Sequence, residues 1–365
     1  MKRYKIIISG GGTGGHIFPA LSIANELRNR YPESEILFIG AEDRMEMERV
    51  PEEGYKIIGL PVSGFNRSHI FKNFEVVSKL IKSLKIAKQT VKTFKPDIVV
   101  GVGGYASAPT LWMASSLHIP VLIQEQNSYA GVTNKILGKR AEKICVAYRG
   151  MEKFFPAQKI VLTGNPVRKD LETIKEKDDE AVKFFGLEKD KPTVLVIGGS
   201  LGARTINNGI RTGLRTILDK GIQIIWQTGR YYYKFLKDEL DRSDYKGLWV
   251  ADFISQMDYA YAVADLVVSR AGAGTISELC LLKKPTVLIP SPNVAEDHQA
   301  KNARALSDNN AAVFIPDNEA ENKITQTIIG LINDKERLCQ LSENITSFAQ
   351  YHSAERIVDE IEKLI

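Results

Sequence analysis

The chain has 365 residues, too many for one ordinary hydrophobic core, so we expect two domains. Its composition, with 44% hydrophobic and 25% charged residues, excludes a largely disordered chain. The net charge is only +5, but basic residues outnumber acidic ones in residues 1–163 and acidic residues are in excess in 164–365, which indicates that the first half meets an anionic partner.

Short β-branched runs alternate with helical segments along the chain. Apolar runs that do not alternate with polar residues are typical of strands buried on both faces of a parallel sheet. In the first half we predict helices at Pro19–Arg30 and Phe71–Lys92 and strands at Tyr4–Ser9, Glu35–Ile39, Ile98–Val102, Val121–Gln124 and Lys143–Val146. In the second half we predict strands at Thr193–Ile197, Ile222–Gln227, Leu248–Ala251, Leu266–Ser269, Thr286–Ile289 and Ala312–Ile315.

The pattern of residues 6–13, a strand followed by a glycine loop, restarts at 194–200. We therefore predict the α/β class, with two doubly wound, Rossmann-like domains facing across a cleft. The expected domains are 1–163 and 164–365, separated near Asn165-Pro166, with the last helix packing back on the first domain. Ligands of such sheets bind beyond the carboxyl ends of the strands.

Three further features bear on the cellular location. Residues 98–124 lack charged side chains but are broken by glycines and prolines, so we predict strand, helix and strand there and no membrane span. No secretory signal is expected at the start of the chain. Cys145, Cys280 and Cys339 lack paired or metal-ligand spacing and indicate buried, reduced thiols in a cytoplasmic protein.

The glycine loop from Gly10 to His16 joins a strand to a helix. Its backbone N–H groups can approach an anion, and the helix start adds positive partial charge. The loop also satisfies the dinucleotide fingerprint, and a tight turn without a ligand is the third interpretation. His16 ends the loop, and a histidine near a positive helix end is biased toward the neutral form that accepts a proton.

Polar residues also follow other predicted strands. Gly103–Tyr105 and 124–127 can hydrogen-bond sugar hydroxyls, with Glu125 as a second candidate base, although loop capping explains Gln124 and Gln126 equally well. Backbone N–H groups of 273–276 could hold a diphosphate while Glu278 binds ribose hydroxyls. No Asp-x-Asp tripeptide or metal-ligand cluster occurs, so we expect helix ends with Arg168 or Arg204 to neutralise a diphosphate, without a metal or another cofactor.

Aromatic residues beside lysines precede and begin the predicted helix of residues 71–92. Phe65, Phe71, Phe74 and Lys72 suit the headgroup boundary of an anionic bilayer, although the lysines of the helix itself also fit a solvated face. Nucleic acid is the weaker candidate for the anionic partner, because the basic residues lack interleaved aromatic stacking positions.

These motifs together resemble the bacterial peptidoglycan transferases that add N-acetylglucosamine (GlcNAc) to undecaprenyl-pyrophosphoryl-N-acetylmuramoyl-pentapeptide. The resemblance runs in order through GGTGGH, GVGGYAS, EQN, GNPVR, GGSLGAR, SRAGAGTISE and EDHQAKNA. It implies the glycosyltransferase B architecture, a UDP-GlcNAc donor on the second domain, and a lipid-linked acceptor against the first. It also implies a peripheral enzyme on the inner face of the cell membrane.

The resemblance also assigns residues, position by position. The acceptor-side and catalytic set comprises Thr13, His16, Gly104, Tyr105 and Asn127, with Glu125 as the alternate base. The donor-side set comprises Thr13, Gly14, Arg168, Ser200, Phe253, Ile254, Ala273, Gly274, Thr275, Glu278, Gln299 and Asn302, in which the Phe253-Ile254 backbone reads uracil. Gln124, Leu201 and His298 depart from the residues most common in the family.

The implied reaction is a single displacement with inversion, in which the muramoyl 4-hydroxyl attacks the anomeric carbon and UDP leaves. Two other function classes stay open from the residues alone. A dinucleotide-dependent oxidoreductase predicts tight binding of NAD or flavin. A non-catalytic lipid-carrier protein predicts lipid binding without affinity for a nucleotide sugar.

Overall fold

The computed structural model describes residues 2–62, 73–167, 171, 174, 176–199, 201–241 and 245–365, except the side chains of 73, 74, 241 and 295. The chain divides into two compact units. Unit 1 comprises Met1–Val167 with Gln350–Ile365, and unit 2 comprises Arg168–Ala349.

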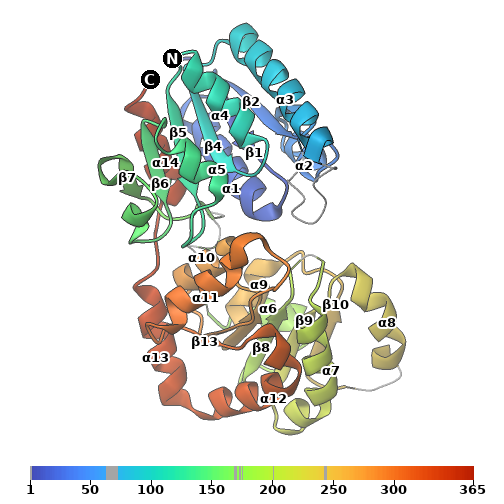
Figure 1. Ribbon diagram of the computed structural model, residues 1–365. Coiled ribbons are helices and arrows are strands. Elements are labelled where there is room, and N and C mark those ends of the chain that lie inside the picture. Colours follow the sequence, from blue (N-terminus) through green and yellow to red (C-terminus); the bar gives the residue numbers. More distant parts are fainter. Residues whose placement is uncertain are drawn as a thin grey trace. The chain divides into compact units, whose positions relative to one another are not determined.

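Unit 1 contains a parallel sheet with the strand order β3-β2-β1-β4-β5-β6-β7 (Figure 1). Its strands are β1 (Lys5–Gly10), β2 (Glu35–Ala41), β3 (Lys56–Leu60), β4 (Ile98–Gly103), β5 (Val121–Glu125), β6 (Lys143–Val146) and β7 (Ile160–Leu162). Successive residues of β1 point to opposite faces, so Ile6 and Ile8 join one core and Ile7 joins the other.

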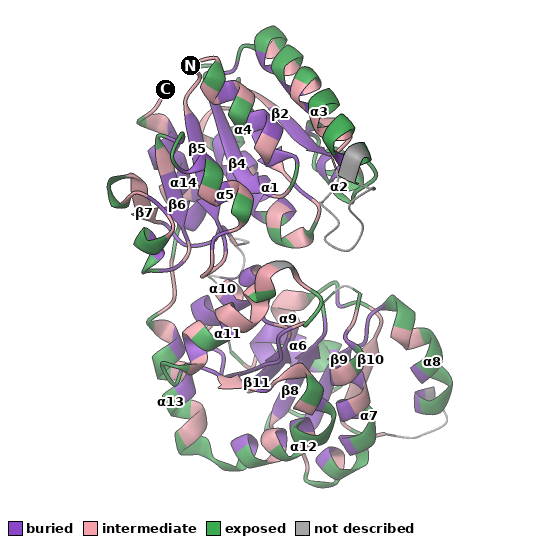
Figure 2. Cartoon of the chain, in the orientation of Figure 1, coloured by how far each residue is buried: buried purple, intermediate pink, exposed green. Residues whose placement is uncertain are grey.

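Helices cover both faces of this sheet. Its α-helices are α1 (Gly14–Arg30), α2 (Glu46–Glu52), α3 (Asn73–Phe94), α4 (Ser107–Ser116), α5 (Val132–Leu137) and α14 (Ser353–Glu362). Buried residues of α1 and α14 pack with Ile6 and Ile8, whereas those of α3, α4 and α5 pack with Ile7. Figure 2 shows the buried residues on the strands and the exposed ones along the outer side of α3.

The first helix begins earlier than the sequence pattern predicted. Pro19 was expected to open it, but α1 starts at Gly14 and contains Pro19. Gly14 and Gly15 therefore form the first helical turn instead of the loop. The late helix α14 lies against α1, where Arg30 donates to Asp359 at 2.6 Å and to Glu362 at 2.9 Å.

Unit 2 contains a second parallel sheet, with the order β10-β9-β8-β11-β12-β13. Its strands are β8 (Thr193–Ile197), β9 (Gln223–Gln227), β10 (Leu248–Ala251), β11 (Leu266–Ser269), β12 (Thr286–Leu288) and β13 (Val313–Phe314). Its α-helices are α6 (Asp179–Phe184), α7 (Arg204–Asp219), α8 (Arg230–Asp241), α9 (Met257–Val263), α10 (Ala273–Leu281), α11 (His298–Ser307), α12 (Asp317–Asn333) and α13 (Lys335–Thr346). The core of one face contains Trp226 from β9 with Ile210 from α7 and Ile328 from α12.

The predicted α/β class with two doubly wound sheets is confirmed, and every predicted strand has a counterpart. Strands β3 and β7 were not predicted. Residues 98–124 form β4, α4 and β5, as expected. Among the described residues, no helix is both long and apolar enough to span a bilayer. The expectation of a buried thiol is wrong for Cys339, which is exposed on α13, whereas Cys145 and Cys280 are buried.

Candidate active-site loops

Each sheet has one place where the strand order reverses, and the candidate loops follow the strands that flank it. These strands are β1 and β4 in unit 1 and β8 and β11 in unit 2. Connections from such neighbouring parallel strands leave toward opposite faces, which opens a crevice at the carboxyl edge of the sheet. The predicted glycine loops all follow these four strands.

The loop after β1 places His16 on the first turn of α1. Thr13 caps the helix in an extended conformation, and its carbonyl accepts the N–H of His16 at 3.1 Å. Thr13 Oγ1 also lies 3.1 Å from His16 Nδ1. When Nδ1–H donates to Thr13, Nε2 carries the lone pair that can accept a proton.

The loop after β4 packs directly on the loop after β1. A Cβ on Gly104 would lie 2.3 Å from the carbonyl oxygen of Gly11, and Gly104 has a φ of +85°. A Cβ on Gly103 would lie 2.8 Å from His16 Cδ2 and 2.9 Å from its Nε2. Only glycine fits at both positions, so the imidazole of His16 can pack directly against the backbone at the end of β4. Tyr105, the next residue, is exposed.

Glu125 is buried and its carboxylate is surrounded by donors. Oε1 accepts the backbone N–H of Asn127 at 3.0 Å and its side-chain amide at 3.3 Å. Oε2 accepts from the Gly131 N–H at 3.1 Å and from Asn134 Nδ2 at 2.9 Å. Burial raises the pKa of Glu125, although these hydrogen bonds oppose the shift. These contacts hold the turn that carries Asn127.

Gln124 and Gln126 bond within the protein, as the loop-capping interpretation predicts. Gln124 Nε2 donates to Asn165 at 2.9 Å, and Gln126 Nε2 donates to the Val102 carbonyl at 2.7 Å and to Gln124 Oε1. Both side chains are buried. Gln126 Oε1 has no hydrogen-bond partner among the residues that the structure describes.

The N–H of Gly12, expected to face an external anion, donates to a carboxylate of the chain. Glu46 Oε1 lies 2.9 Å and Oε2 3.0 Å from Gly12 N, and Oε1 also accepts from Ala41 N at 3.0 Å. Glu46 is 1% exposed. The carboxylate of Glu46 thus takes the place that an external anion was expected to occupy at the Gly12 N–H. No role was predicted for Glu46.

In unit 2, the loop after β8 is tied to the segment after β10. Gln227 Nε2 donates to the carbonyl of Gly199 at 3.2 Å, and its Oε1 accepts the N–H of Ile254 at 2.9 Å. One backbone group of the Phe253-Ile254 segment that was expected to read uracil, the Ile254 N–H, is thus occupied by Gln227. Phe253 is exposed beside it. Ser200 and Arg168 lie outside the described residues, and Arg204 is exposed at the start of α7.

The loop after β11 opens α10, as predicted. Gly272 caps the helix, and its carbonyl accepts the N–H of Ile276 at 2.9 Å. The expectation that Ile276 N–H holds a phosphate is therefore wrong, and only residues 273–275 remain for that role. Glu278 is half-buried, and its Oε2 accepts the hydroxyl of the buried Tyr261 at 2.8 Å.

Arg270 joins this loop to three other segments of unit 2. Its Nη1 donates to the carbonyls of Ile289 and Pro290, each at 3.1 Å, and to Asp317 Oδ1. Nη2 donates to Thr205 Oγ1 at 3.2 Å. Because these partners follow β12 and begin α12 and α7, one guanidinium fixes loops that the sequence places far apart. Arg270 lies within the SRAGAGTISE motif, but no role was predicted for it.

The segment from 290 to 302 supports the same edge of the sheet. Gln299 Oε1 accepts the N–H of Ser291 at 2.8 Å. Asn302 is fully buried, and its Nδ2 makes a long contact of 3.5 Å with the carbonyl of Ala271. Asn302, expected in the donor-side set, thus lies under the loop before α10.

The residues expected to contact the membrane lie around positions 65–74. Phe65, Phe71 and Lys72 lie outside the described residues, as does the side chain of Phe74. The helices that follow do carry exposed apolar residues, among them Val77 and Ile81 on α3, Trp112 on α4, and Val132 and Ile136 on α5.

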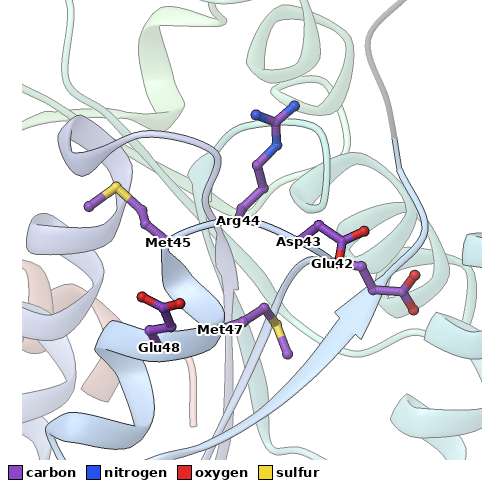
Figure 3. A pocket seen from close by; sticks show the side chains of 6 residues that line it. All are labelled: Glu42, Asp43, Arg44, Met45, Met47 and Glu48. Atoms are coloured by element: carbon purple, nitrogen blue, oxygen red, sulfur yellow. The ribbon is translucent and has the colours of Figure 1, made fainter. Parts of the chain in front are cut away.

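A surface hollow of about 600 Å³ lies at the turn between β2 and α2 (Figure 3). It is lined by Glu42, Asp43, Arg44, Met45, Met47 and Glu48. None of the expected site residues lines it, and we assign it no part in binding.

Comparisons with known proteins match both units. Residues 6–146 match the glycosyltransferase family 28 N-terminal domain, and residues 193–358 match the corresponding C-terminal domain. A protein of Parabacteroides distasonis is 63% identical over 100% of this chain and 99% of its own length. Its name is UDP-N-acetylglucosamine–N-acetylmuramyl-(pentapeptide) pyrophosphoryl-undecaprenol N-acetylglucosamine transferase. A Bacteroides thetaiotaomicron protein of the same name is 56% identical over 100% of this chain and 98% of its own.

Solved structures agree with these sequence matches. The crystal structure of MurG from Acinetobacter baumannii superimposes with a TM-score of 0.80 at 28% identity, covering 99% of both chains. The calicheamicin glycosyltransferase CalG4 gives a TM-score of 0.72 at 16% identity, over 100% of this chain and 98% of that one, which shows a shared fold only.

Proposed function

The chain belongs to the UDP-N-acetylglucosamine–N-acetylmuramyl-(pentapeptide) pyrophosphoryl-undecaprenol N-acetylglucosamine transferases, and on that premise we propose how its residues perform the transfer. The enzyme moves GlcNAc from UDP-GlcNAc to the 4-hydroxyl of the lipid-linked muramoyl sugar, a step of peptidoglycan precursor synthesis. Membership in a family of transferases leaves no place for the oxidoreductase or the non-catalytic lipid-carrier alternative.

His16 is the general base in this proposal. The observation that carries it is the contact of 3.1 Å between Thr13 Oγ1 and His16 Nδ1, which fits the tautomer with a basic Nε2. His16 takes the proton of the muramoyl 4-hydroxyl as the oxygen attacks the anomeric carbon. The bond from that carbon to the β-phosphate oxygen breaks, and UDP leaves with the electron pair.

Glu125, the alternative base, is better suited to positioning. Both of its oxygens accept hydrogen bonds from Asn127, Gly131 and Asn134, so proton transfer to it would disturb the turn that it holds. Within this proposal, Asn127, Gly104 and Tyr105 border the acceptor sugar, and Glu125 keeps Asn127 in place.

The loops of unit 2 bind the donor in this proposal. Ala273, Gly274 and Thr275, at the first turn of α10, face the diphosphate, where the helix dipole favours negative charge. Glu278 accepts from the ribose hydroxyls, and Phe253 borders the uracil. Gln299 borders the sugar, and Asn302 supports the loop before α10. Arg168 and Ser200 of unit 2, with Thr13 and Gly14 of unit 1, are carried into the donor set by resemblance.

Binding to an anionic membrane surface is the third part of the proposal. Val77 and Ile81, which are 44% and 50% exposed, lie on α3 beside the exposed Lys82, Lys85 and Lys88. Apolar residues flanked by lysines suit the boundary between headgroups and acyl chains. In this proposal, the side of α3 that carries Val77, Ile81 and these lysines holds the enzyme peripherally at the inner membrane surface, where its lipid-linked acceptor resides.

Transfer of radiolabelled GlcNAc from UDP-GlcNAc to a short-chain analogue of the lipid-linked muramoyl-pentapeptide tests the reaction and the base. We expect transfer by the wild type to survive EDTA, because helix ends and arginines neutralise the diphosphate in this proposal. The His16→Ala enzyme should lose about 10²- to 10⁴-fold in kcat, the range of general base catalysis.

The same assay can overturn each part separately. Near-normal turnover by the His16→Ala enzyme would reject His16 as the base. Loss of wild-type transfer in EDTA, restored by added magnesium, would reject a metal-independent diphosphate site. UDP-GlcNAc binding without any transfer would contradict the assignment of the acceptor.

A further inference from the structure

We propose that Glu46 is a positioning residue for the transfer, whose carboxylate fixes the turn before α1 and thereby the place of His16. The inference rests on the proposed role of His16. Glu46 is the first residue of α2 and is 1% exposed. Its carboxylate accepts from Gly12 N at 2.9 and 3.0 Å and from Ala41 N at 3.0 Å, which joins the turn after β1 to the end of β2.

The backbone around Glu46 is shaped to admit this carboxylate. A Cβ on Gly11 would lie 2.0 Å from Glu46 Oε1, and a Cβ on Gly40 would lie 2.6 Å from Glu46 Cγ. Any larger residue at either position would displace the carboxylate. A helix-start turn that could bind an external anion instead receives an internal one, with hydrogen bonds of the strong, charge-assisted kind.

The held turn leads directly to His16. Gly12 precedes Thr13, which contacts His16 through both its carbonyl and its hydroxyl. On the other side, the Gly11 carbonyl lies against Gly104. The turn is thus fixed between Glu46 and the β4 loop, and a shift at Gly12 moves His16 relative to the sugar that it must deprotonate. A misplacement of about 1 Å can cost roughly 10²-fold in rate.

Glu48 provides a matched control on the same helix. It is exposed, lies two residues beyond Glu46, and lines the surface hollow of Figure 3. The Glu46→Gln and Glu48→Gln changes each remove one negative charge from α2. Only Glu46→Gln changes an acceptor of the Gly12 N–H. Its amide has one oxygen and one NH2 group, so it cannot accept in all three contacts with Gly12 N and Ala41 N.

The experiment measures kcat and both KM values for transfer to the short-chain acceptor analogue, with hydrogen exchange followed by mass spectrometry. We expect Glu46→Gln to lower kcat by about 10- to 100-fold, a larger factor than any rise in the KM for UDP-GlcNAc that follows from moving Thr13 and Gly14. Exchange should accelerate in peptides that cover residues 10–16 and not in β8. Glu48→Gln should match the wild type in every readout.

A second variant displaces the carboxylate without removing it. Gly40→Ala places a Cβ against Glu46 Cγ and should reproduce the loss of kcat. The proposal is overturned if the kcat of Glu46→Gln equals that of the wild type, or if Glu48→Gln loses as much activity as Glu46→Gln. It is also overturned if hydrogen exchange rises throughout unit 1 in both Glu46→Gln and Gly40→Ala. Failure of the wild type itself to transfer GlcNAc would instead reject the proposed function on which the inference rests.

Discussion

At the scale of single residues, the functional side chains expected at the loops depend on buried partners. Glu278, the expected ribose ligand, accepts a hydrogen bond of 2.8 Å from Tyr261, which is 1% exposed on α9. Because a carboxylate on a helix can adopt several rotamers, the fixed hydroxyl of Tyr261 selects one of them for Glu278. On the proposed role of Glu278, Tyr261 therefore sets the direction of its carboxylate.

We expect Tyr261→Phe to raise the KM for UDP-GlcNAc about 3- to 10-fold with little change in kcat, since one hydrogen bond is worth about 1 kcal/mol. Steady-state kinetics with UDP-GlcNAc and its 2′-deoxyribose analogue provide the measurement. The preference for the ribose donor should shrink in the variant.

Tyr259→Phe is the matched control on the same helix, because Tyr259 contacts Glu180 at 3.5 Å instead of Glu278. An unchanged preference for the ribose donor in Tyr261→Phe would show that Tyr261 does not orient Glu278.

The residues that hold the candidate loops in place were not predicted, for one physical reason. Glycine loops are visible in the sequence because their pattern is local. Glu46, Gln227, Arg270 and Tyr261 act through contacts that depend on the register between strands and on helix packing. Arg270 meets Asp317 across 47 positions of the chain, and no local pattern carries that information.

At the scale of elements, the fully buried central strands were predicted, and so were the partly buried edge strands β10 and β13 of unit 2. Ile6, Ile7 and Ile8 in β1 are fully buried, and such unbroken apolar runs predict central parallel strands well. The missed strands β3 and β7 lie at the two edges of their sheet, where only Leu60 is fully buried and the apolar runs are short. The start of α1 was misplaced because two glycines adopt helical conformation there.

The packing of α14 leads to a prediction at the same scale. Ile357 is fully buried and shares a core with Ile6 and Ile8 of β1. We expect Ile357→Ala to cost about 2–5 kcal/mol of the stability of unit 1 through the cavity that it leaves. Hydrogen exchange should accelerate in β1 peptides and not in β8 peptides, which belong to a separate core.

Ile136→Ala is the chemically equal control, because Ile136 is 56% exposed on α5. Equal exchange of β1 in the Ile357→Ala variant and the wild type would show that α14 contributes little to this core.

At the scale of the whole molecule, the excess of basic residues and one group of exposed apolar residues coincide in unit 1, although unit 2 also carries exposed apolar residues, such as Phe235 on α8. Basic residues are in excess over residues 1–163, and α3 carries three exposed lysines beside Val77 and Ile81. Electrostatic attraction to anionic lipid acts over about a Debye length, whereas apolar contact acts only at the surface. Membrane binding should therefore need both the basic residues and the exposed apolar side chains of α3.

We expect the wild type to sediment with vesicles containing phosphatidylglycerol and much less with pure phosphatidylcholine, and binding should weaken as salt is raised. Changing Val77 and Ile81 together to serine should reduce the sedimented fraction at least several-fold, because the apolar contact is lost.

Phe235→Ser is the control, since Phe235 is 68% exposed but lies on α8 of unit 2. An equal loss on changing Phe235 would place the membrane contact elsewhere, and full binding by the Val77 and Ile81 double variant would remove the α3 face from the proposal.

The return of the chain to unit 1 after Ala349 also fixes an order of events during synthesis. A ribosome completes all of unit 2 before it makes α14, whose Ile357, Val358 and Ile361 belong to the core around β1. Domains fold as units as they emerge, and unit 2 emerges as one uninterrupted stretch. On a nascent chain, the half of the enzyme that is translated first is therefore the half whose core closes last.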